Sequence, residues 1–373
     1  MMPPPADAIA RLRLARTEGV GPQTHRRLLA RFGSAAAALD ALPRLSRGAS
    51  VPPPEAAVRR EMEAVARLGG RFLFAGTPGY PPLLDALEDP PPALAVLGDP
   101  AALAPSAVAL VGARNASAAG RRVAEELAEA LARAGQTVVS GLARGVDTAA
   151  HLGALRVAGG RTVAAVAGGL DQPYPPENAK LQARIAAEGG AVVAEAPLGT
   201  APLARHFPRR NRIVAGLALG VVVVEAALRS GSLITARMGL EAGREIFAVP
   251  GSPLDPRCRG SNDLIRQGAH LTETVADVLE HLPEAPRDAP LFAPRPESEA
   301  SEDPPPDSSE AAGEGSQLLE LLGPTPIPVD EVVRRCHLSP SAVQAILLDL
   351  ELAGRVEMLP GNRVALSGRA RAC

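Results

Sequence analysis

The sequence predicts an α/β protein, with a Rossmann-like, doubly wound and mainly parallel sheet between an N-terminal helical domain and a C-terminal winged-helix domain. Short apolar runs in the middle of the chain end in glycine-rich turns, and helical patterns lie between them, as at residues 120–134 and 233–243. Continuous apolar strands separated by amphipathic helices indicate a parallel sheet that is covered on both faces. The expected strands are Val108–Val111, Thr137–Val139, Thr162–Val166, Ala191–Ala194, Val221–Val224 and Ile246–Val249.

Composition divides the 373 residues into four segments. Residues 283–315 are rich in proline, serine and acidic side chains and cannot bury enough apolar surface to fold, so a disordered linker is expected there. Residues 1–69 are expected to be helical and to resemble a SAM or helix-hairpin-helix domain, and residues 70–282 alternate strand and helix. Residues 316–368 are expected to form a winged helix, with helices at Gln317–Leu322, Val329–Cys336 and Pro340–Ala353 and a β-wing at Arg355–Leu366.

Composition and charge exclude several classes of protein. The net charge of −2 excludes a histone-like protein that holds DNA by bulk charge, but it permits a local basic groove. The only lysine, Lys180, follows an alanine, which excludes a P-loop ATPase. The three cysteines form no CxxC pair and the six histidines have no metal-ligand spacing, so neither a disulfide framework nor a metal or other cofactor is expected. No signal peptide or membrane span is evident, which favours a soluble, cytoplasmic protein.

Glycines and cations are concentrated in the segments that follow the expected strands. In a parallel sheet these segments share one edge, where helix N-termini present free N–H groups to a ligand. Such an edge suits several phosphates, and the guanidinium group of arginine matches phosphate oxygens with a fork of donors. The candidate phosphate contacts are Arg114, Lys180, Arg209, Arg210 and Arg212.

Two of the few aromatic residues, Tyr174 and Phe207, fall in the same segments. Exposed rings beside arginines stack bases at roughly 1–3 kcal/mol per base, and stacking combined with phosphate contacts favours single-stranded nucleic acid. The alternative interpretation, given equal weight, is that both rings cap the core of the sheet. The run Phe207–Arg212 is expected at the end of a long loop.

Three titratable residues are candidates for catalysis. Asp147 and His151 stand four residues apart on one expected helix, but a structural role is favoured, with Asp147 in the first turn and His151 packed or hydrogen-bonded. Glu225 follows a strand. It is expected either to act as a general acid or to pair with an arginine, and the two interpretations have equal weight. No G-x-G-x-x-G follows the first strand, so the dinucleotide-binding fingerprint is absent.

Five motifs, covering roughly residues 105–275, resemble the DNA-processing protein A (DprA/Smf) family. One position departs from the family pattern: Ala119 stands before Gly120, where an aromatic residue is usual, and this affects one packing or stacking contact. The motifs are Ser140–His151, Tyr174-Pro175 with Asn178, Phe207–Arg212, Val224–Ala226 with Ser230–Ala236, and Gly260–Asn262 with Leu264-Ile265 and Gly268-Ala269.

The resemblance implies a non-enzymatic, single-stranded DNA-binding protein that protects incoming DNA during natural transformation and helps to load the RecA recombinase. It also implies a homodimer formed around Leu264, Ile265 and Leu271. The motifs and the strand-end segments together give the expected DNA-binding residues: Gly112, Arg114, Ser117, Arg144, Tyr174, Lys180, Phe207, Arg209, Arg210, Asn211, Arg212 and Ser232.

Whether each flanking domain binds DNA is open to two interpretations. Residues 19–21 (Gly-Val-Gly) resemble a helix-hairpin-helix turn, whose N–H groups can meet a phosphate, and a helical domain that never touches DNA has equal weight. The expected recognition helix of the winged helix has no Arg or Lys, and Asp349 and Glu351 add negative charge. A protein contact or a degenerate structural module is therefore favoured over base readout, and a transcription regulator is disfavoured.

The alternative function is a nucleotide-processing enzyme of the N-glycosidase type. Related Rossmann-like proteins with that activity use a Pro-Gly-Gly-Gly-x-Gly-Thr-x-x-Glu loop. The corresponding segment here, Arg229–Leu233, lacks the glycine run.

Overall fold

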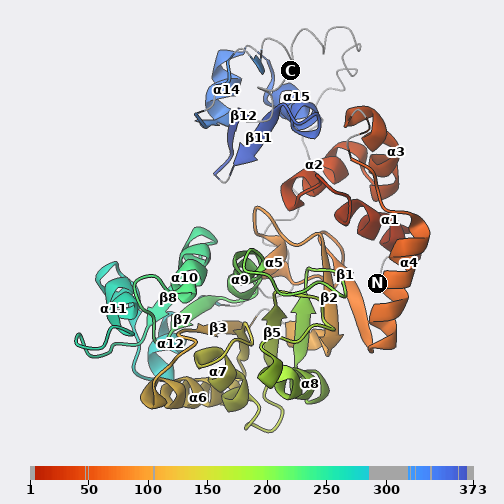
Figure 1. Ribbon diagram of the computed structural model, residues 1–373. Helices are drawn as coiled ribbons and strands as arrows, with labels where there is room; N and C mark the ends of the chain where they lie inside the picture. Colours follow the sequence, from red (N-terminus) through yellow and green to blue (C-terminus); the bar gives the residue numbers. More distant parts are fainter. Residues whose placement is uncertain are drawn as a thin grey trace. The chain divides into compact units, whose positions relative to one another are not determined.

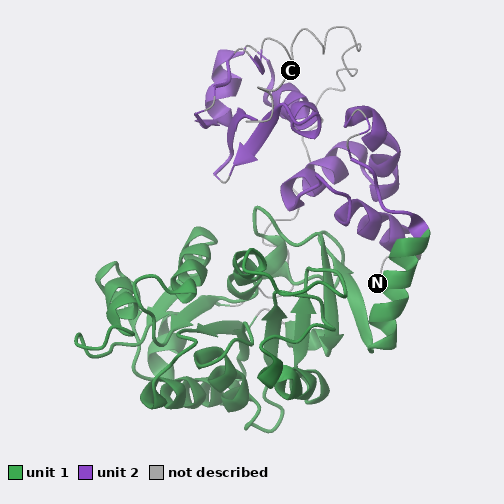
Figure 2. Ribbon diagram, viewed as in Figure 1, with its two compact units in different colours: residues 1–4, 56–289 green, residues 5–55, 290–373 purple. Residues whose placement is uncertain are grey.

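The computed structural model describes residues 5–46, 48, 50–103, 106–284, 318–319, 321–323, 325–336, 338–359 and 361–367. The chain forms two compact units (Figure 2): residues 56–289 with 1–4 in the first, and residues 5–55 with 290–373 in the second. The predicted linker lies outside the described residues from position 285 onward, as does part of the helix predicted at Gln317–Leu322.

The first unit is built on a nine-stranded sheet (Figure 1). Its strands follow the order β1-β2-β6-β5-β4-β3-β7-β8-β9, and all neighbours from β6 to β9 are parallel, whereas β1 and β2 pair antiparallel at one edge. The six predicted strands are present to within one residue at each end. They are β3 (Ala107–Val111), β4 (Thr137–Ser140), β5 (Thr162–Val166), β6 (Ala191–Ala194), β7 (Gly220–Val223) and β8 (Glu245–Ala248). The sequence did not predict β1 (Gly70–Phe74), β2 (Ala93–Gly98) or β9 (His270–Leu271).

Helices cover both faces of this sheet, as the continuous apolar strands predict. Along β3, Val108 and Leu110 belong to one buried cluster, whereas Ala109 and Val111 belong to another, because successive strand side chains point to opposite faces. The first cluster packs under α6 (Ala118–Arg133), α7 (Val146–Ala154) and α12 (Val275–His281), and the second under α9 (His206–Gly216) and α10 (Gly231–Glu241). The remaining helices and turns of this unit are α4 (Glu55–Arg67), which begins in the second unit, α5 (Pro82–Asp85), α8 (Ala179–Ala187), α11 (Arg259–Arg266), η1 (Pro100–Leu103) and η2 (Pro176–Asn178).

The second unit combines three N-terminal helices with the predicted winged helix. Pro22 starts α2 and Gly33, at φ 72°, ends it, so the two residues stand where proline and glycine are preferred at helix ends. Ser339 caps α15 by accepting the Ala342 N–H. The elements are α1 (Pro5–Ala15), α2 (Pro22–Phe32), α3 (Ala35–Leu45), β10 (Ile327–Pro328), α14 (Val329–Arg335), α15 (Pro340–Leu352), β11 (Val356–Leu359) and β12 (Arg363–Leu366). None of the helices described is both long enough and apolar enough to cross a bilayer.

Candidate nucleic-acid site

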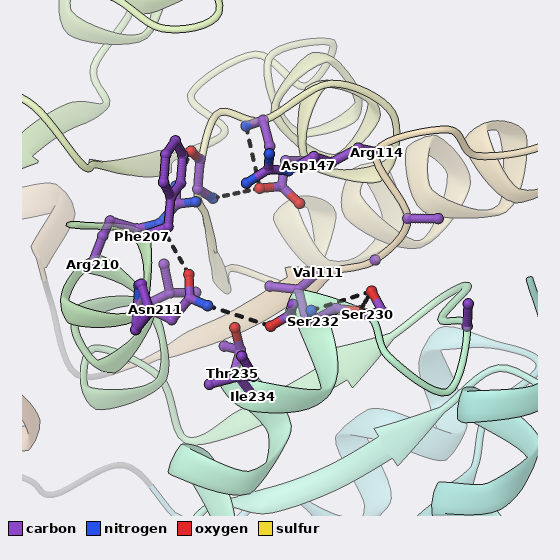
Figure 3. A pocket seen from close by; sticks show the side chains of 18 of the residues that line it. Val111, Arg114, Asp147, Phe207, Arg210, Asn211, Ser230, Ser232, Ile234 and Thr235 are labelled. Atoms are coloured by element: carbon purple, nitrogen blue, oxygen red, sulfur yellow. Dashed lines mark hydrogen bonds between the residues drawn. The ribbon is translucent and has the colours of Figure 1, made fainter. Parts of the chain in front are cut away.

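A pocket of about 790 Å³ lies at the carboxyl ends of the central strands (Figure 3). Its walls come from residues 111–115 after β3, residues 141–147 after β4, the start of α9 and residues 227–235 after β7. Successive crossovers run from β3 toward β6 in one direction and from β7 toward β9 in the other. The pocket therefore lies at the point where the strand order reverses, which is where open parallel sheets bind their ligands.

Seven of the twelve predicted DNA-binding residues line this pocket, and five do not. The seven come from four separate segments that the fold brings together. They are Gly112, Arg114, Tyr174, Phe207, Arg210, Asn211 and Ser232. The five that lie elsewhere are Ser117, Arg144, Lys180, Arg209 and Arg212.

An arginine and two aromatic rings form a cluster in this pocket, in which Arg114 and Tyr174 are exposed and Phe207 is half-buried. The Arg114 guanidinium carbon lies 4.8 Å from the centroid of the Phe207 ring, which is within cation–π distance. Phe207 in turn packs against Tyr174 with ring centroids 5.7 Å apart, and Tyr174 is 42% exposed. Neither ring belongs to the buried clusters of the sheet, so the interpretation that they cap its core is wrong. The cluster presents both a cation and π-faces to a ligand.

Arg210 and Asp147 form the buried floor of the pocket. Arg210 donates to the carbonyl oxygens of Gly141 and Ala165, the latter at 2.9 Å. Asp147 accepts the N–H groups of Gly141 and Ala143 at 3.2 and 3.3 Å. Burial raises the pKa of Asp147 and lowers that of Arg210, and the attraction between the two groups opposes both shifts. Arg210 therefore holds the β4 segment in place and adds positive potential beneath the cluster.

Glu225 closes the N-terminus of α6. Its carboxylate accepts the Ser117 N–H at 2.9 Å and the Ser117 hydroxyl, while Ser117 Oγ accepts the Gly120 N–H at 2.8 Å. A Cβ atom on Gly120 would lie 2.4 Å from the Glu225 carboxyl carbon, so a larger residue there would displace this carboxylate. The hydrogen-bond partner of Glu225 is Ser117, and no arginine among the described residues lies within ion-pair distance of Glu225. Its charge nevertheless acts on one arginine, because the hydrogen bond from Arg257 to Asp255 and, more weakly, the attraction of Glu225 raise the pKa of Arg257. The helix N-terminus that holds a phosphate in dinucleotide-binding folds is thus occupied by the protein's own carboxylate.

The run Phe207–Arg212 is helical, and the predicted loop is wrong. These residues form the first turns of α9, where each position is rotated by about 100° from the last. Arg210 points to the pocket floor and Arg209 is exposed outside the pocket. Arg212 is buried on the other side, where it donates to the Asp89 carbonyl oxygen and to the Glu195 carboxylate, both at 2.6 Å.

Two other predicted cations are exposed outside the pocket. Arg144 follows β4 and forms an ion pair with Glu177, which raises the pKa of Arg144 and lowers that of Glu177. Lys180 lies in the first turn of α8, after the segment that follows β5. Both therefore belong to the carboxyl edge of the sheet.

His151 is a buried structural side chain, as predicted. Its Nδ1 atom lies 2.7 Å from the Thr162 hydroxyl, and burial lowers the pKa of His151 to about 3, so the ring is neutral at physiological pH. Asp147 lies in the first turn of α7, also as predicted. The two residues form no acid/base pair.

The sequence prediction missed two arginines of the pocket. Arg229 follows β7 and is exposed, and Arg257 comes from the segment before α11, where it pairs with Asp255 at 2.7 Å. Arg229 stands between the two parts of one motif, Val224–Ala226 and Ser230–Ala236, and its position after a strand was the available signal. No group of side chains among the described residues has the arrangement of a metal site.

Family models match three stretches of the chain. The model described as DNA recombination-mediator protein A matches residues 71–283, the DprA-like N-terminal HHH domain matches residues 5–64, and the DprA winged helix domain matches residues 302–362. The chain is 44% identical over 301 residues to Protein Smf of Escherichia coli, covering 79% of this chain and 76% of that protein. It is 43% identical over 206 residues to DNA processing protein DprA of Bacillus subtilis, covering 55% of this chain and 69% of that protein.

The solved structures that are similar to this one include two of DNA processing protein A. The crystal structure of DNA processing protein A from Streptococcus pneumoniae superposes with a TM-score of 0.63 at 33% identity, covering 76% of this chain and 99% of that chain. A structure of DNA processing protein A from Helicobacter pylori, described for its single-stranded DNA binding mode, gives a TM-score of 0.51 at 30% identity. It covers 56% of this chain and 94% of that chain.

Proposed function

Because this chain belongs to the DNA-processing protein A (DprA/Smf) family, we propose that it binds single-stranded DNA, without catalysis, in the pocket at the carboxyl edge of its sheet. The observation that carries the proposal is the cluster of Arg114, Phe207 and Tyr174. A cation beside π-faces suits a strand whose phosphates and bases are both accessible, whereas a duplex hides its base faces. The reported single-stranded DNA binding of the Helicobacter pylori protein supports this choice.

The proposed contacts divide into two groups. Within the pocket, Arg114 and Arg229 meet phosphates, Phe207 and Tyr174 stack bases, and Gly112, Asn211 and Ser232 contribute backbone or polar contacts. Beyond it, Arg144, Lys180 and Arg209 are exposed cations that extend the path of the strand. Ser117 and Arg212 act indirectly, because the first holds Glu225 and the second is already paired.

A binding role is favoured over the N-glycosidase alternative. Such an enzyme needs a carboxylate that reaches the substrate, whereas Glu225 is buried against Ser117 and Asp147 is held by two backbone N–H groups. We further propose that the bound strand is incoming DNA in natural transformation, protected and passed to a RecA-type recombinase. This part of the proposal is supported by family membership alone.

We also propose a homodimer through the segment that contains Leu264, Ile265 and Leu271. Leu271 lies in the edge strand β9 and is 49% exposed, and Leu264 lines a second cavity of about 710 Å³ between α10 and α11. β9 pairs with β8 on one side only, and an apolar side chain at the open edge of a sheet favours association.

Arg114→Ala tests the binding site. We expect the affinity for a labelled single-stranded oligonucleotide to fall about tenfold, and the slope of log affinity against log salt to lose about 0.7, because one phosphate contact disappears. Arg121→Ala is the matched control, since Arg121 is exposed on α6 and does not line the pocket. Equal affinities for the two variants would refute the site, and release of free base from a panel of nucleotides would refute the non-enzymatic role.

A further inference from the structure

Helix α15 of the winged helix has two buried apolar faces, although a helix on the surface of a small domain needs one. Val343, Ile346 and Leu347 belong to the core of the winged helix itself. Leu348 and Leu352, four residues apart, belong instead to the buried cluster of the N-terminal helices. Residues four apart lie on the same side of a helix, so the second face is a continuous stripe. Its neighbours in that cluster include Leu14, Val20 and Leu28.

Ion pairs flank this apolar contact. Arg31 Nη1 lies 2.7 Å from Asp349 Oδ1, and Arg27 Nη1 lies 3.3 Å from Glu351 Oε2. Glu351 is 21% exposed, and burial raises its pKa while Arg27 and a hydrogen bond from Thr24 oppose the shift. Both arginines stand on α2, one turn apart.

The two helices are complementary in charge over their whole length. The α2 sequence PQTHRRLLARF has three arginines and no acidic residue, and the α15 sequence PSAVQAILLDLEL has two acidic residues and no basic one. Complementary charge around an apolar centre is the usual composition of a specific protein contact. An arginine-rich helix without carboxylates would otherwise attract nucleic-acid phosphates.

We propose that α15 is a protein-docking helix whose partner is α2 of the same chain, and that Asp349 and Glu351 cover the arginine face of α2 against polyanions. In winged helices that read DNA, the corresponding helix enters the major groove. Here that helix is committed to an internal contact, which joins the first and last domains of the chain into one body.

Hydrogen exchange of the full-length protein tests the docking. We expect the amides of residues 28–32 in α2 to exchange about tenfold faster in Asp349→Arg/Glu351→Arg, because two attractions become repulsions. Adding Arg27→Glu and Arg31→Glu should restore the protection by swapping the charges. The control Asp330→Arg/Glu357→Arg makes the same charge change at exposed positions of the winged helix and should leave α2 unaffected.

Failure of the charge swap to restore protection, or an equal effect of the control, would overturn the docking. The swap also separates docking from simple unfolding of the winged helix, since an unfolded domain would not be rescued by changes on α2. Protection of α2 that appears only at high protein concentration would show that the partner is a second copy and would overturn the contact within one chain.

Oligonucleotide binding tests the covering role separately. In an Arg114→Ala background, Asp349→Asn/Glu351→Gln should raise the residual affinity for a single-stranded oligonucleotide about threefold, since two arginines are uncovered. Adding Arg27→Ala and Arg31→Ala to that variant should abolish the gain in affinity. The control pair Asp330→Asn/Glu357→Gln, in the same Arg114→Ala background, should leave the affinity unchanged. Equal affinities for Asp349→Asn/Glu351→Gln and for the control pair would overturn the covering role. This outcome is independent of whether Arg114→Ala alone weakens binding, so it does not depend on the proposed pocket.

Discussion

Phe207 is the central residue of the proposed aromatic and cationic cluster, because its ring lies close to two arginines and to the second aromatic ring. Its ring lies 4.8 Å from the Arg114 guanidinium carbon, 5.8 Å from that of Arg210 and 5.7 Å from the Tyr174 ring. Two cations therefore lie close to one ring and restrict its position before a ligand arrives. A positioned aromatic side chain binds with a smaller loss of conformational entropy than a free one.

Phe207→Ala should weaken single-stranded DNA binding by about 1–3 kcal/mol, the range found for loss of one base–aromatic stack. The salt dependence should stay the same, since no phosphate contact is removed. Phe207→Tyr should retain most of the affinity, whereas Phe207→Leu should lose it. Fluorescence anisotropy at several salt concentrations measures both quantities, and full affinity for Phe207→Leu would show that the ring packs without stacking.

Two buried histidines make stability depend on pH. Burial lowers the pKa of His25 to about 4 and that of His151 to about 3, from an ordinary value near 6.5. Both rings are neutral in the folded protein but take up a proton in the unfolded chain below about pH 6.5. Stability is therefore complete above that pH and is lost as the pH falls toward the folded values.

Below about pH 6.5 and above its folded pKa, each histidine should lower the free energy of unfolding by about 1.4 kcal/mol for each pH unit. Urea unfolding at about pH 7 and about pH 5.5 measures the loss. His25→Leu should remove its share of the pH dependence, and an unchanged slope in that variant would show that another group titrates.

At the scale of the element, α9 gives three neighbouring arginines three different surroundings. Arg209 is exposed, Arg210 lies under the pocket and Arg212 is paired on the opposite side of the helix. The helical rotation alone separates them, although they are nearly adjacent in the sequence. The same motif therefore supplies a binding surface and an anchor for the helix that carries it.

Arg212→Ala should lower the free energy of unfolding by about 2–3 kcal/mol, because the partly buried groups of Asp89 and Glu195 lose a charged partner. Arg209→Ala should change it by less than about 0.5 kcal/mol, as is usual for an exposed side chain. Denaturant titration of the two variants compares a buried with an exposed arginine of one helix. Equal stabilities would show that the Arg212 ion pairs contribute nothing.

At the scale of the whole molecule, the proposed dimer would place two pockets on one strand. Two linked sites bind more tightly than one, because the second contact forms at a high effective concentration. The segment around β9 lies at the edge of the sheet farthest from β1, and β8 separates β9 from β7, whose following segment lines the pocket. The proposed interface therefore lies on the same side of the sheet as the pocket's β7 wall.

Leu271→Arg should convert a dimer into a monomer, because it places a charge in the apolar contact. Light scattering after size exclusion measures the mass, and the oligonucleotide affinity should fall with it. Leu254→Arg is the control, since Leu254 is 88% exposed and lies outside the predicted segment. A mass unchanged by Leu271→Arg would place the interface elsewhere.

Local periodicity was sufficient to predict most of the fold. The six inner strands and the helices 120–134 and 340–353 follow from apolar runs, glycine turns and caps, which act between near neighbours in the chain. Of the three strands that were not predicted, β9 has two residues and therefore no periodicity to detect, whereas β1 and β2 are five and six residues long and were overlooked. The pocket residues after β3 and β7 were predictable because the ends of parallel strands share one edge.

The sequence by itself therefore determined that this protein has a doubly wound sheet with glycines, arginines and aromatic rings at its carboxyl edge. Only the tertiary structure decided that Arg114 and Phe207 meet in the pocket, that Arg212 is paired elsewhere and that Glu225 closes α6. The physical reason is the separation along the chain of the residues that interact. Strand and helix formation depend on neighbours a few residues away. Burial and charge pairing depend on partners far along the chain, such as Ser117 and Glu225, which are 108 positions apart.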